Sequence, residues 1–407
     1  PPSPKQQKKS PFHIPIEIGL LEFSKDAIEG TVTLEKTTRK LLELKKSKER
    51  FSFKNLKNKP LLSFLRNFSA PVKVRKFQPK SELFLLMAHD DDLFNRWNYA
   101  HQLTVEVIKN VTLSLKFGKK PIVDKDYLEA LSVCIQKQED MALCAKILTF
   151  PSEPYLAQQM KVVEPELLHR SVTIVKKTVA IFLWNWLEDT YRQCYEADSH
   201  SVSAAAMAQR SLKNCCLAYL SLPGIEDSAA QQLCLKHLRM SRNMTDVFAA
   251  LSALSHFDSE NTKIAFREFY QQWQRDSLVV DKWLTLQATS TLPSTLETVK
   301  LLMSHEAFSL LNPNKVRALI GSFCSLNHYR FHDESGAGYR FLVQQVLKID
   351  SINSQIAARL LTPLTSYLNY SQKLKVMMEE QLRFIADQKD LSADVYEIIA
   401  RTLDSRS

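Results

Sequence analysis

Glycine is scarce in this sequence, with 7 glycines among 407 residues. An average protein of this length would contain roughly four times as many. Glycine serves left-handed turns, tight hairpins and close approaches of the backbone to phosphate groups. The composition therefore predicts a mostly helical chain. It also argues against a glycine-rich phosphate loop, since Gly336-Ala337-Gly338 lacks the rest of a G-x-G-x-x-G motif.

Long apolar runs and C-x-x-C pairs are missing as well. No run reaches about 18 apolar residues, so no membrane-spanning helix and no membrane contact are expected. The cysteines lie in apolar helical patterns, as is typical of thiols that act as small core residues in a reducing compartment. The sequence thus predicts a cytoplasmic protein. The seven cysteines are Cys134, Cys144, Cys194, Cys215, Cys216, Cys234 and Cys324.

A catalytic zinc motif is also absent. His305-Glu306 begins an H-E-x-x-H pattern, but Ser309 stands where the second histidine would have to face the ion. The run His89–Asp92 is interpreted as the acidic cap of the following helix. The run His332–Glu334 lies in a predicted loop with no second histidine nearby. No metal ligand, no catalytic residue and no cofactor are therefore predicted in this chain.

Positive charge is concentrated at the start of the chain. Residues 1–80 carry 19 Lys and Arg against 7 Asp and Glu, a net charge of +12 in a chain whose total is +10. One interpretation is a nucleic-acid-binding segment. The other is a solvated edge strand and loop whose lysines oppose aggregation. The second is favoured, and no nucleic-acid partner is predicted, because no aromatic stacking residues interleave with the lysines of residues 40–59.

The pattern along the chain changes twice. Residues 1–10 are rich in Pro, Lys and Gln and are predicted to form a linker within a longer polypeptide. Residues 11–80 alternate apolar and polar side chains at 12–18, 32–34, 51–53 and 72–74, which predicts about four antiparallel strands. So few strands indicate a small, incomplete β-sandwich.

From residue 81 to residue 407 the apolar period is 3.6, which predicts about fifteen to seventeen helices with short connections. The longest of them is expected to start at Pro165 and to end near Cys194. Antiparallel helices in series, without strands between them, predict a HEAT-like superhelix. Such an array could also act as a free-standing helical-repeat scaffold whose concave face binds a protein partner.

Several strings in this chain resemble the bacterial aminopeptidase N family, in the same order and over residues 12–404. They are His13–Ile16, Phe68–Lys73, Asn243–Asp246, Asp281–Trp283 and Asn312–Gly321. The resemblance implies a zinc aminopeptidase that removes N-terminal residues from peptides, with this chain as its non-catalytic C-terminal portion. The zinc would lie in a catalytic domain that carries H-E-x-x-H, so this chain alone is expected to be inactive.

The same resemblance implies a role for three side chains. Arg317 and Arg359 match positions whose arginines face the peptide cavity, where a guanidinium can bind a carboxylate with two hydrogen bonds. Gln355 lies four residues before Arg359 and would share its helix face. Ion pairing within the fold is the alternative for each arginine. The implied partners are the protein's own N-terminal and catalytic domains and the peptide substrate.

Overall fold

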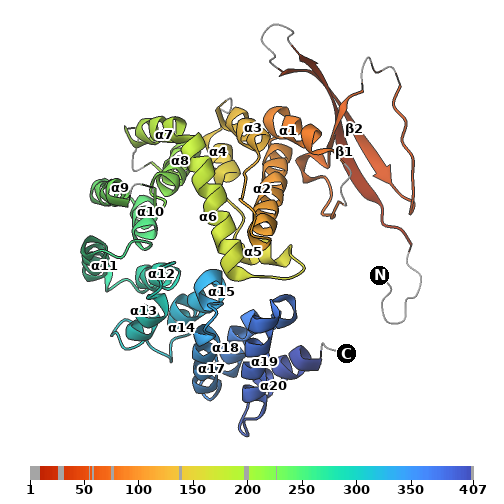
Figure 1. Ribbon diagram of the computed structural model, residues 1–407. Helices are drawn as coiled ribbons and strands as arrows, with labels where there is room; N and C mark the ends of the chain where they lie inside the picture. The colour runs from red at the N-terminus through yellow and green to blue at the C-terminus, as the bar shows by residue number, and fades with distance from the viewer. Residues whose placement is uncertain are drawn as a thin grey trace. The chain divides into compact units, whose positions relative to one another are not determined.

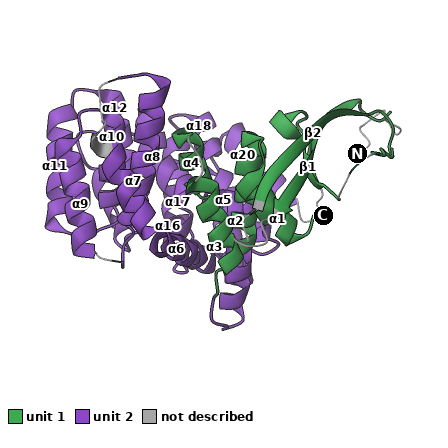
Figure 2. Cartoon of the chain, turned by 90° about the horizontal axis from the view of Figure 1, so that it is seen from above, with its two compact units in different colours: residues 1–107, 122–150 green, residues 108–121, 151–407 purple. Residues whose placement is uncertain are grey.

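The computed structural model describes residues 10–25, 32–54, 56, 59–74, 78–136, 140–196, 201–225 and 227–404. Most of these residues are helical, and one small sheet precedes the helices (Figure 1). The chain forms two compact units (Figure 2): residues 1–107 with 122–150, and residues 108–121 with 151–407. None of the described helices is long and apolar enough to cross a membrane.

The sheet of unit 1 has the order β2-β1-β3. Strand β1 (Ile14–Lys25) pairs antiparallel with β2 (Val32–Leu44) on one side and with β3 (Leu61–Phe64) on the other. The alternation of Ile16, Ile18 and Leu20 places these side chains in one buried cluster, as the period-2 pattern predicts. In the sheet that the described residues form, β2 is an edge strand, and it carries Lys36, Arg39 and Lys40.

Two of the predicted strands are wrong. Residues 51–53 and 72–74 contain no strand, and the third strand is formed instead by Leu61–Phe64. This strand does not alternate because its polar Ser63 is fully buried, where its hydroxyl accepts a hydrogen bond from Asn95 at 2.8 Å. Two apolar residues around a polar one are too short a pattern to identify a strand.

A fully buried arginine joins the sheet to the helices of unit 1. Arg66 Nη1 lies 2.9 Å from Asp90 Oδ1, and its Nη2 lies 2.7 Å from Asp91 Oδ1. Asp92 caps the next helix by accepting a hydrogen bond from Asn95 N at 2.8 Å. The predicted acidic cap is therefore confirmed for Asp92, while the other two carboxylates hold Arg66. The helices that begin in unit 1 are α1 (Lys80–His89), α2 (Leu93–Lys116), α3 (Lys125–Gln136) and α4 (Met141–Leu148).

Unit 2 is a series of helices in which neighbours along the chain pack on one another. The first are α5 (Glu153–Gln158), α6 (Pro165–Phe182), α7 (Trp184–Glu196), α8 (Ala204–Leu220), α9 (Asp227–Met240), α10 (Met244–Leu254), α11 (Glu260–Trp273), α12 (Ser277–Ala288) and α13 (Thr295–Leu302). They are followed by α14 (Pro313–Val316), a π-helical turn η2 (Arg317–Gly321), α15 (Ser322–Leu326), α16 (His328–Phe331), α17 (Ala337–Asp350), α18 (Ser354–Leu360), the 3-10 turns η3 (Thr362–Leu364) and η4 (Tyr367–Asn369), α19 (Gln372–Ala386) and α20 (Ala393–Asp404).

The helices of unit 2 are arranged in two rows: α9 and α11 lie in one row, and α10 and α12 lie in the other (Figures 1 and 2). The predicted fold class, mainly α with a helical array after a small antiparallel sheet, is confirmed. The single helix expected from Pro165 to Cys194 is wrong, because Leu183 separates α6 from α7. Helical segments are more numerous than predicted because short pieces such as α14 and α16 are distinct.

Candidate functional site

Helix α18 carries two of the three residues that the sequence singled out. Its N-terminus is capped by Asn353, whose side chain accepts a hydrogen bond from Ile356 N at 3.1 Å. Gln355 and Arg359 are exposed and stand one turn apart, while Leu360 and its buried neighbours face the core. The helix therefore presents both polar side chains on one face, as the i, i+4 spacing predicts.

The third residue, Arg317, opens the π-helical turn η2. Its side chain is exposed, and its Nη1 donates a hydrogen bond to Asn314 Oδ1 at 2.9 Å. Gly321 ends the turn and packs against α18: a Cβ placed there would lie 3.8 Å from Leu360 Cδ2 and 3.9 Å from Arg317 Cβ. Arg317 therefore lies close to the end of α18. We call Arg317, Gln355 and Arg359 the arginine face.

The arginine face has few internal electrostatic partners. Among the described residues, no carboxylate lies within ion-pair distance of either guanidinium, and the nearby Asp281 pairs with Lys315 at 2.7 Å instead. A guanidinium without a carboxylate partner keeps most of its hydrogen-bond donors available in a fork that matches a carboxylate. The face can therefore bind an anionic group from outside the chain.

A cavity whose lining includes two histidines and a tyrosine lies at the C-terminal end of α18. Thr362 donates a hydrogen bond from its hydroxyl to the Arg359 carbonyl at 2.7 Å and lines this cavity of about 320 Å³. We call it the histidine pocket. Its lining also includes Cys324, His328, His332 and Tyr370.

A chain of hydrogen bonds forms the inner wall of the histidine pocket. The Tyr370 hydroxyl lies 3.2 Å from His328 Nε2 and 3.1 Å from His332 Nε2. On its other side, His332 Nδ1 lies 2.8 Å from the Tyr339 hydroxyl. The expectation that His332 has no second histidine nearby is wrong, because the ring centroids of His328 and His332 are 4.8 Å apart. The H-x-x-x-H spacing was the signal that could have revealed this pair.

These groups are neutral near pH 7. Burial lowers the pKa of His328 to about 4, and it lowers the pKa of His332 well below the usual range, with His328 adding to the effect. Burial raises the pKa of Tyr370 to about 12 and also raises that of the Cys324 thiol. The pocket can therefore donate and accept hydrogen bonds, but it holds no activated nucleophile.

The other histidine clusters from the sequence make structural contacts. The His305 ring packs 4.7 Å from the Tyr270 ring, and Glu306 accepts a hydrogen bond from the Tyr270 hydroxyl at 3.0 Å. His89 packs edge-on against Phe23 at 6.0 Å. Within the described residues, no group of three or more His, Cys, Asp or Glu side chains is placed to hold a metal ion.

Two family models match the chain. Residues 80–404 match the model described as "Domain of unknown function (DUF3458_C) ARM repeats", and residues 1–77 match the model described as "Domain of unknown function (DUF3458) Ig-like fold". These matches agree with a small β region followed by a helical array.

Among curated proteins, aminopeptidase N of Escherichia coli is 33% identical over 408 residues, and that of Haemophilus influenzae is 30% identical over 411 residues. Each alignment covers 99% of this chain and 46% of the relative, so the chain spans about half the length of these relatives. A crystal structure of Legionella pneumophila aminopeptidase A in complex with aspartic acid matches with a TM-score of 0.82 and 28% identity, over 97% of this chain and 45% of that one.

Proposed function

The chain belongs to the DUF3458_C ARM-repeat family and corresponds to the C-terminal portion of an aminopeptidase N-type enzyme, and we propose that it forms the non-catalytic wall of that enzyme's peptide chamber. The observation that carries the proposal is the arginine face. Arg317 and Arg359 are exposed and have no carboxylate partner among the described residues, and the Arg359 carbonyl accepts a hydrogen bond from Thr362, which lines the histidine pocket. Such a surface suits the carboxylate end of a peptide whose N-terminus is being cleaved.

The proposal assigns the chemistry to a part outside this chain. The parent would remove N-terminal residues by attack of a metal-activated water, with zinc held in a catalytic domain. The helical array of residues 81–407 would cap the active-site cleft, and residues 11–80 would form part of a β-sandwich after a linker at 1–10. Its partners would be its own N-terminal and catalytic domains and the peptide substrate. The seven free cysteines favour a cytoplasmic setting for the parent.

The first test is to determine the coding sequence immediately upstream of Pro1. We expect an in-frame H-E-x-x-H followed by a glutamate ligand, and metal-dependent cleavage of an amino acid amide by the protein that includes it. An upstream region without that motif would instead favour the free-standing helical scaffold.

A second test addresses the arginine face in the protein that includes the upstream region. Arg359→Ala should raise the KM for short peptides by about tenfold, since a hydrogen-bonded charged group contributes ~1.5 kcal/mol or more. The KM for a single-residue amide, which lacks the distal carboxylate, should stay unchanged. Arg340→Ala removes another exposed arginine, on α17, and serves as the matched control. Equal effects of Arg359→Ala on both substrates would show that Arg359 is structural.

A further inference from the structure

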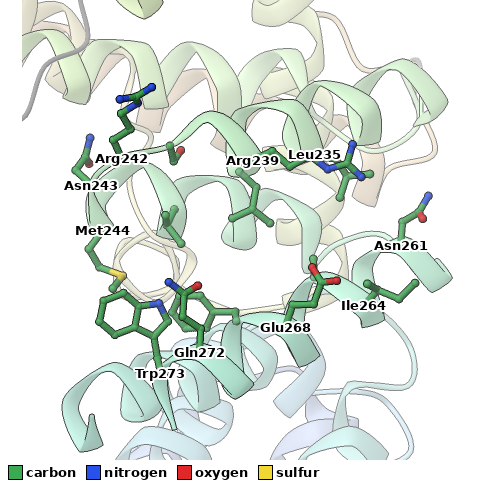
Figure 3. A pocket seen from close by; sticks show the side chains of 15 residues that line it. Leu235, Arg239, Arg242, Asn243, Met244, Asn261, Ile264, Glu268, Gln272 and Trp273 are labelled. Carbon is green, nitrogen blue, oxygen red and sulfur yellow. The ribbon is translucent and has the colours of Figure 1, made fainter. Parts of the chain in front are cut away.

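A groove of about 560 Å³ lies between α9, the start of α10 and α11 (Figure 3). None of its lining residues belongs to the arginine face or to the histidine pocket. Its volume is within the range of ~300–1,000 Å³ that is usual for ligand pockets. The groove is therefore large enough for several peptide residues.

One wall of the groove is a complete face of α11. The lining residues of this helix recur at the i, i+3, i+4 spacing of a single helix face, and they extend over about 18 Å at 1.5 Å per residue. Phe269 and Ala265 are buried at the base, Trp273 is half-buried at one end, and Glu268 and Gln272 are exposed along the rim. The α11 residues are Asn261, Ile264, Ala265, Glu268, Phe269, Gln272 and Trp273.

The opposite wall carries the positive charge. Arg239 lies in the last turn of α9 and Arg242 lies in the turn before α10, and both side chains are exposed. Neither forms an ion pair with any residue that the structure describes. Glu268 is the single acidic residue among the groove's lining, so the two guanidinium groups outnumber it. Figure 3 shows these side chains around the opening.

A helix cap and a buried ion pair hold the turn that carries Arg242 in place. The Asn243 side chain accepts a hydrogen bond from Asp246 N at 3.0 Å and thereby caps α10. Asp246 in turn pairs with Lys213 of α8 at 2.8 Å, and both side chains are about 1% exposed. A groove whose wall is fixed before binding loses less conformational freedom when a ligand enters.

We propose that this groove binds an extended acidic peptide. Carboxylates of the peptide pair with Arg239 and Arg242, and a large apolar side chain packs on Phe269 at the base and on Met244 and Trp273 beside it. At ~3.3 Å per residue, about five extended residues fit along the α11 face. The charge of the groove selects an acidic peptide over a neutral or basic one. This inference does not depend on the aminopeptidase assignment.

The test is calorimetric titration of the full chain with two hexapeptides, acetyl-Gly-Asp-Phe-Asp-Leu-Gly-amide and its Asn counterpart. Neither has a free N-terminus, so neither is a substrate for an aminopeptidase, and failure here would leave the proposed function untouched. We expect the acidic peptide to bind at least about tenfold more tightly than the neutral one, with the difference shrinking as salt is added.

Single substitutions test whether the peptides bind in this groove. Arg239→Ala and Arg242→Ala should each weaken the acidic peptide by about tenfold, as expected for loss of a charge-assisted hydrogen bond. Arg275→Ala removes an equal charge from an exposed position just after α11 and should have no effect. Trp273→Leu should weaken both peptides, because it removes the indole on which the apolar side chain packs.

Four outcomes would overturn the proposal. Equal affinities for the acidic peptide and its Asn counterpart would show that charge does not determine binding. A loss in Arg275→Ala equal to that in Arg242→Ala would mean non-specific attraction. Loss of binding in Arg359→Ala alone would place the peptide on the arginine face. Concentration-dependent sedimentation that Arg242→Glu abolishes would make a second copy of the chain the occupant.

Discussion

Acid should destabilise the folded chain, because several of its histidines are buried in the uncharged form. His328 is the example from which the size of the loss follows. Its pKa is about 4 in the folded chain, against about 6.5 for an unperturbed histidine, because burial outweighs the attraction of Glu153, whose Oε2 lies 4.0 Å from Nδ1. The unfolded chain takes up the proton below pH 6.5, but the folded chain does so only near pH 4. The stability is therefore complete above pH 6.5 and is lost as the pH falls from 6.5 to 4.

The difference between the two pKa values sets how much the unfolding free energy changes with pH. On going from about pH 7.5 to about pH 5, the lowered pKa of His328 should cost about 2 kcal/mol of unfolding free energy. The variant His328→Asn cannot titrate, so its unfolding free energy should change with pH by about 2 kcal/mol less than that of the original chain. Urea unfolding followed by circular dichroism at both pH values measures this difference.

Tyr370→Phe is the matched control for this comparison. It removes the hydroxyl that contacts His328 and His332 but leaves both imidazoles buried. Its unfolding free energy should fall by a similar amount at both pH values, by about 1–3 kcal/mol for two buried groups left without that partner. If His328→Asn kept the full pH dependence, the assignment of acid sensitivity to this buried chain of side chains would be refuted.

Three further predictions concern packing. Gly19→Ala should destabilise unit 1 by about 1–3 kcal/mol, because its Cβ would lie 2.6 Å from Nη1 of Arg66, which Asp90 and Asp91 hold in place. Urea unfolding measures this loss, and an unchanged unfolding midpoint would contradict the prediction. Gly338→Ala should destabilise the fold at least as much, because its Cβ would overlap the Phe331 carbonyl oxygen. Gly321→Ala should be tolerated, because no atom lies closer than 3.8 Å to the position of its Cβ. Equal melting temperatures for these two variants would contradict this contrast. Asp246→Ala should cost about 3–5 kcal/mol by leaving Lys213 buried without its carboxylate, and replacing both residues by apolar ones in a double-mutant cycle should recover much of that loss.

The helical pattern could be predicted from the sequence because it is local, whereas the pairing of distant charges could not. Arg66 and Asp90 are 24 positions apart and meet only when the sheet packs on the start of α2. The break at Leu183 has no local signal either, since no proline or glycine stands there. Leu183 N bonds Val179 O, and Leu187 N bonds Leu183 O, so these two backbone hydrogen bonds are kept at the break. Local propensity does not specify such a break, because tertiary context routinely overrides it.

Two of the strings that carry the family resemblance are accounted for by contacts between neighbouring helices. In the run Asp281–Trp283, the carboxylate pairs with Lys315, and the Trp283 indole donates a hydrogen bond to the Phe266 carbonyl at 3.0 Å. Lys315 itself belongs to another of the matching strings, so these two runs contain the two ends of one ion pair. Their residue types are therefore explained by packing and need no ligand.

Arg317 differs from the other charged members of these strings. It follows Lys315 by two positions, yet its guanidinium points to solvent and meets only the Asn314 amide among the described residues. An exposed arginine with so weak a partner adds little to folding stability, since even a complete surface ion pair contributes ~0–1 kcal/mol. If Arg317 served only the stability of the fold, Arg317→Ala would lower the melting temperature at most slightly and would leave peptide binding unchanged. The proposed function requires instead that it weaken peptide binding while the melting temperature stays the same, so these two measurements on one variant separate a packing residue from a binding residue.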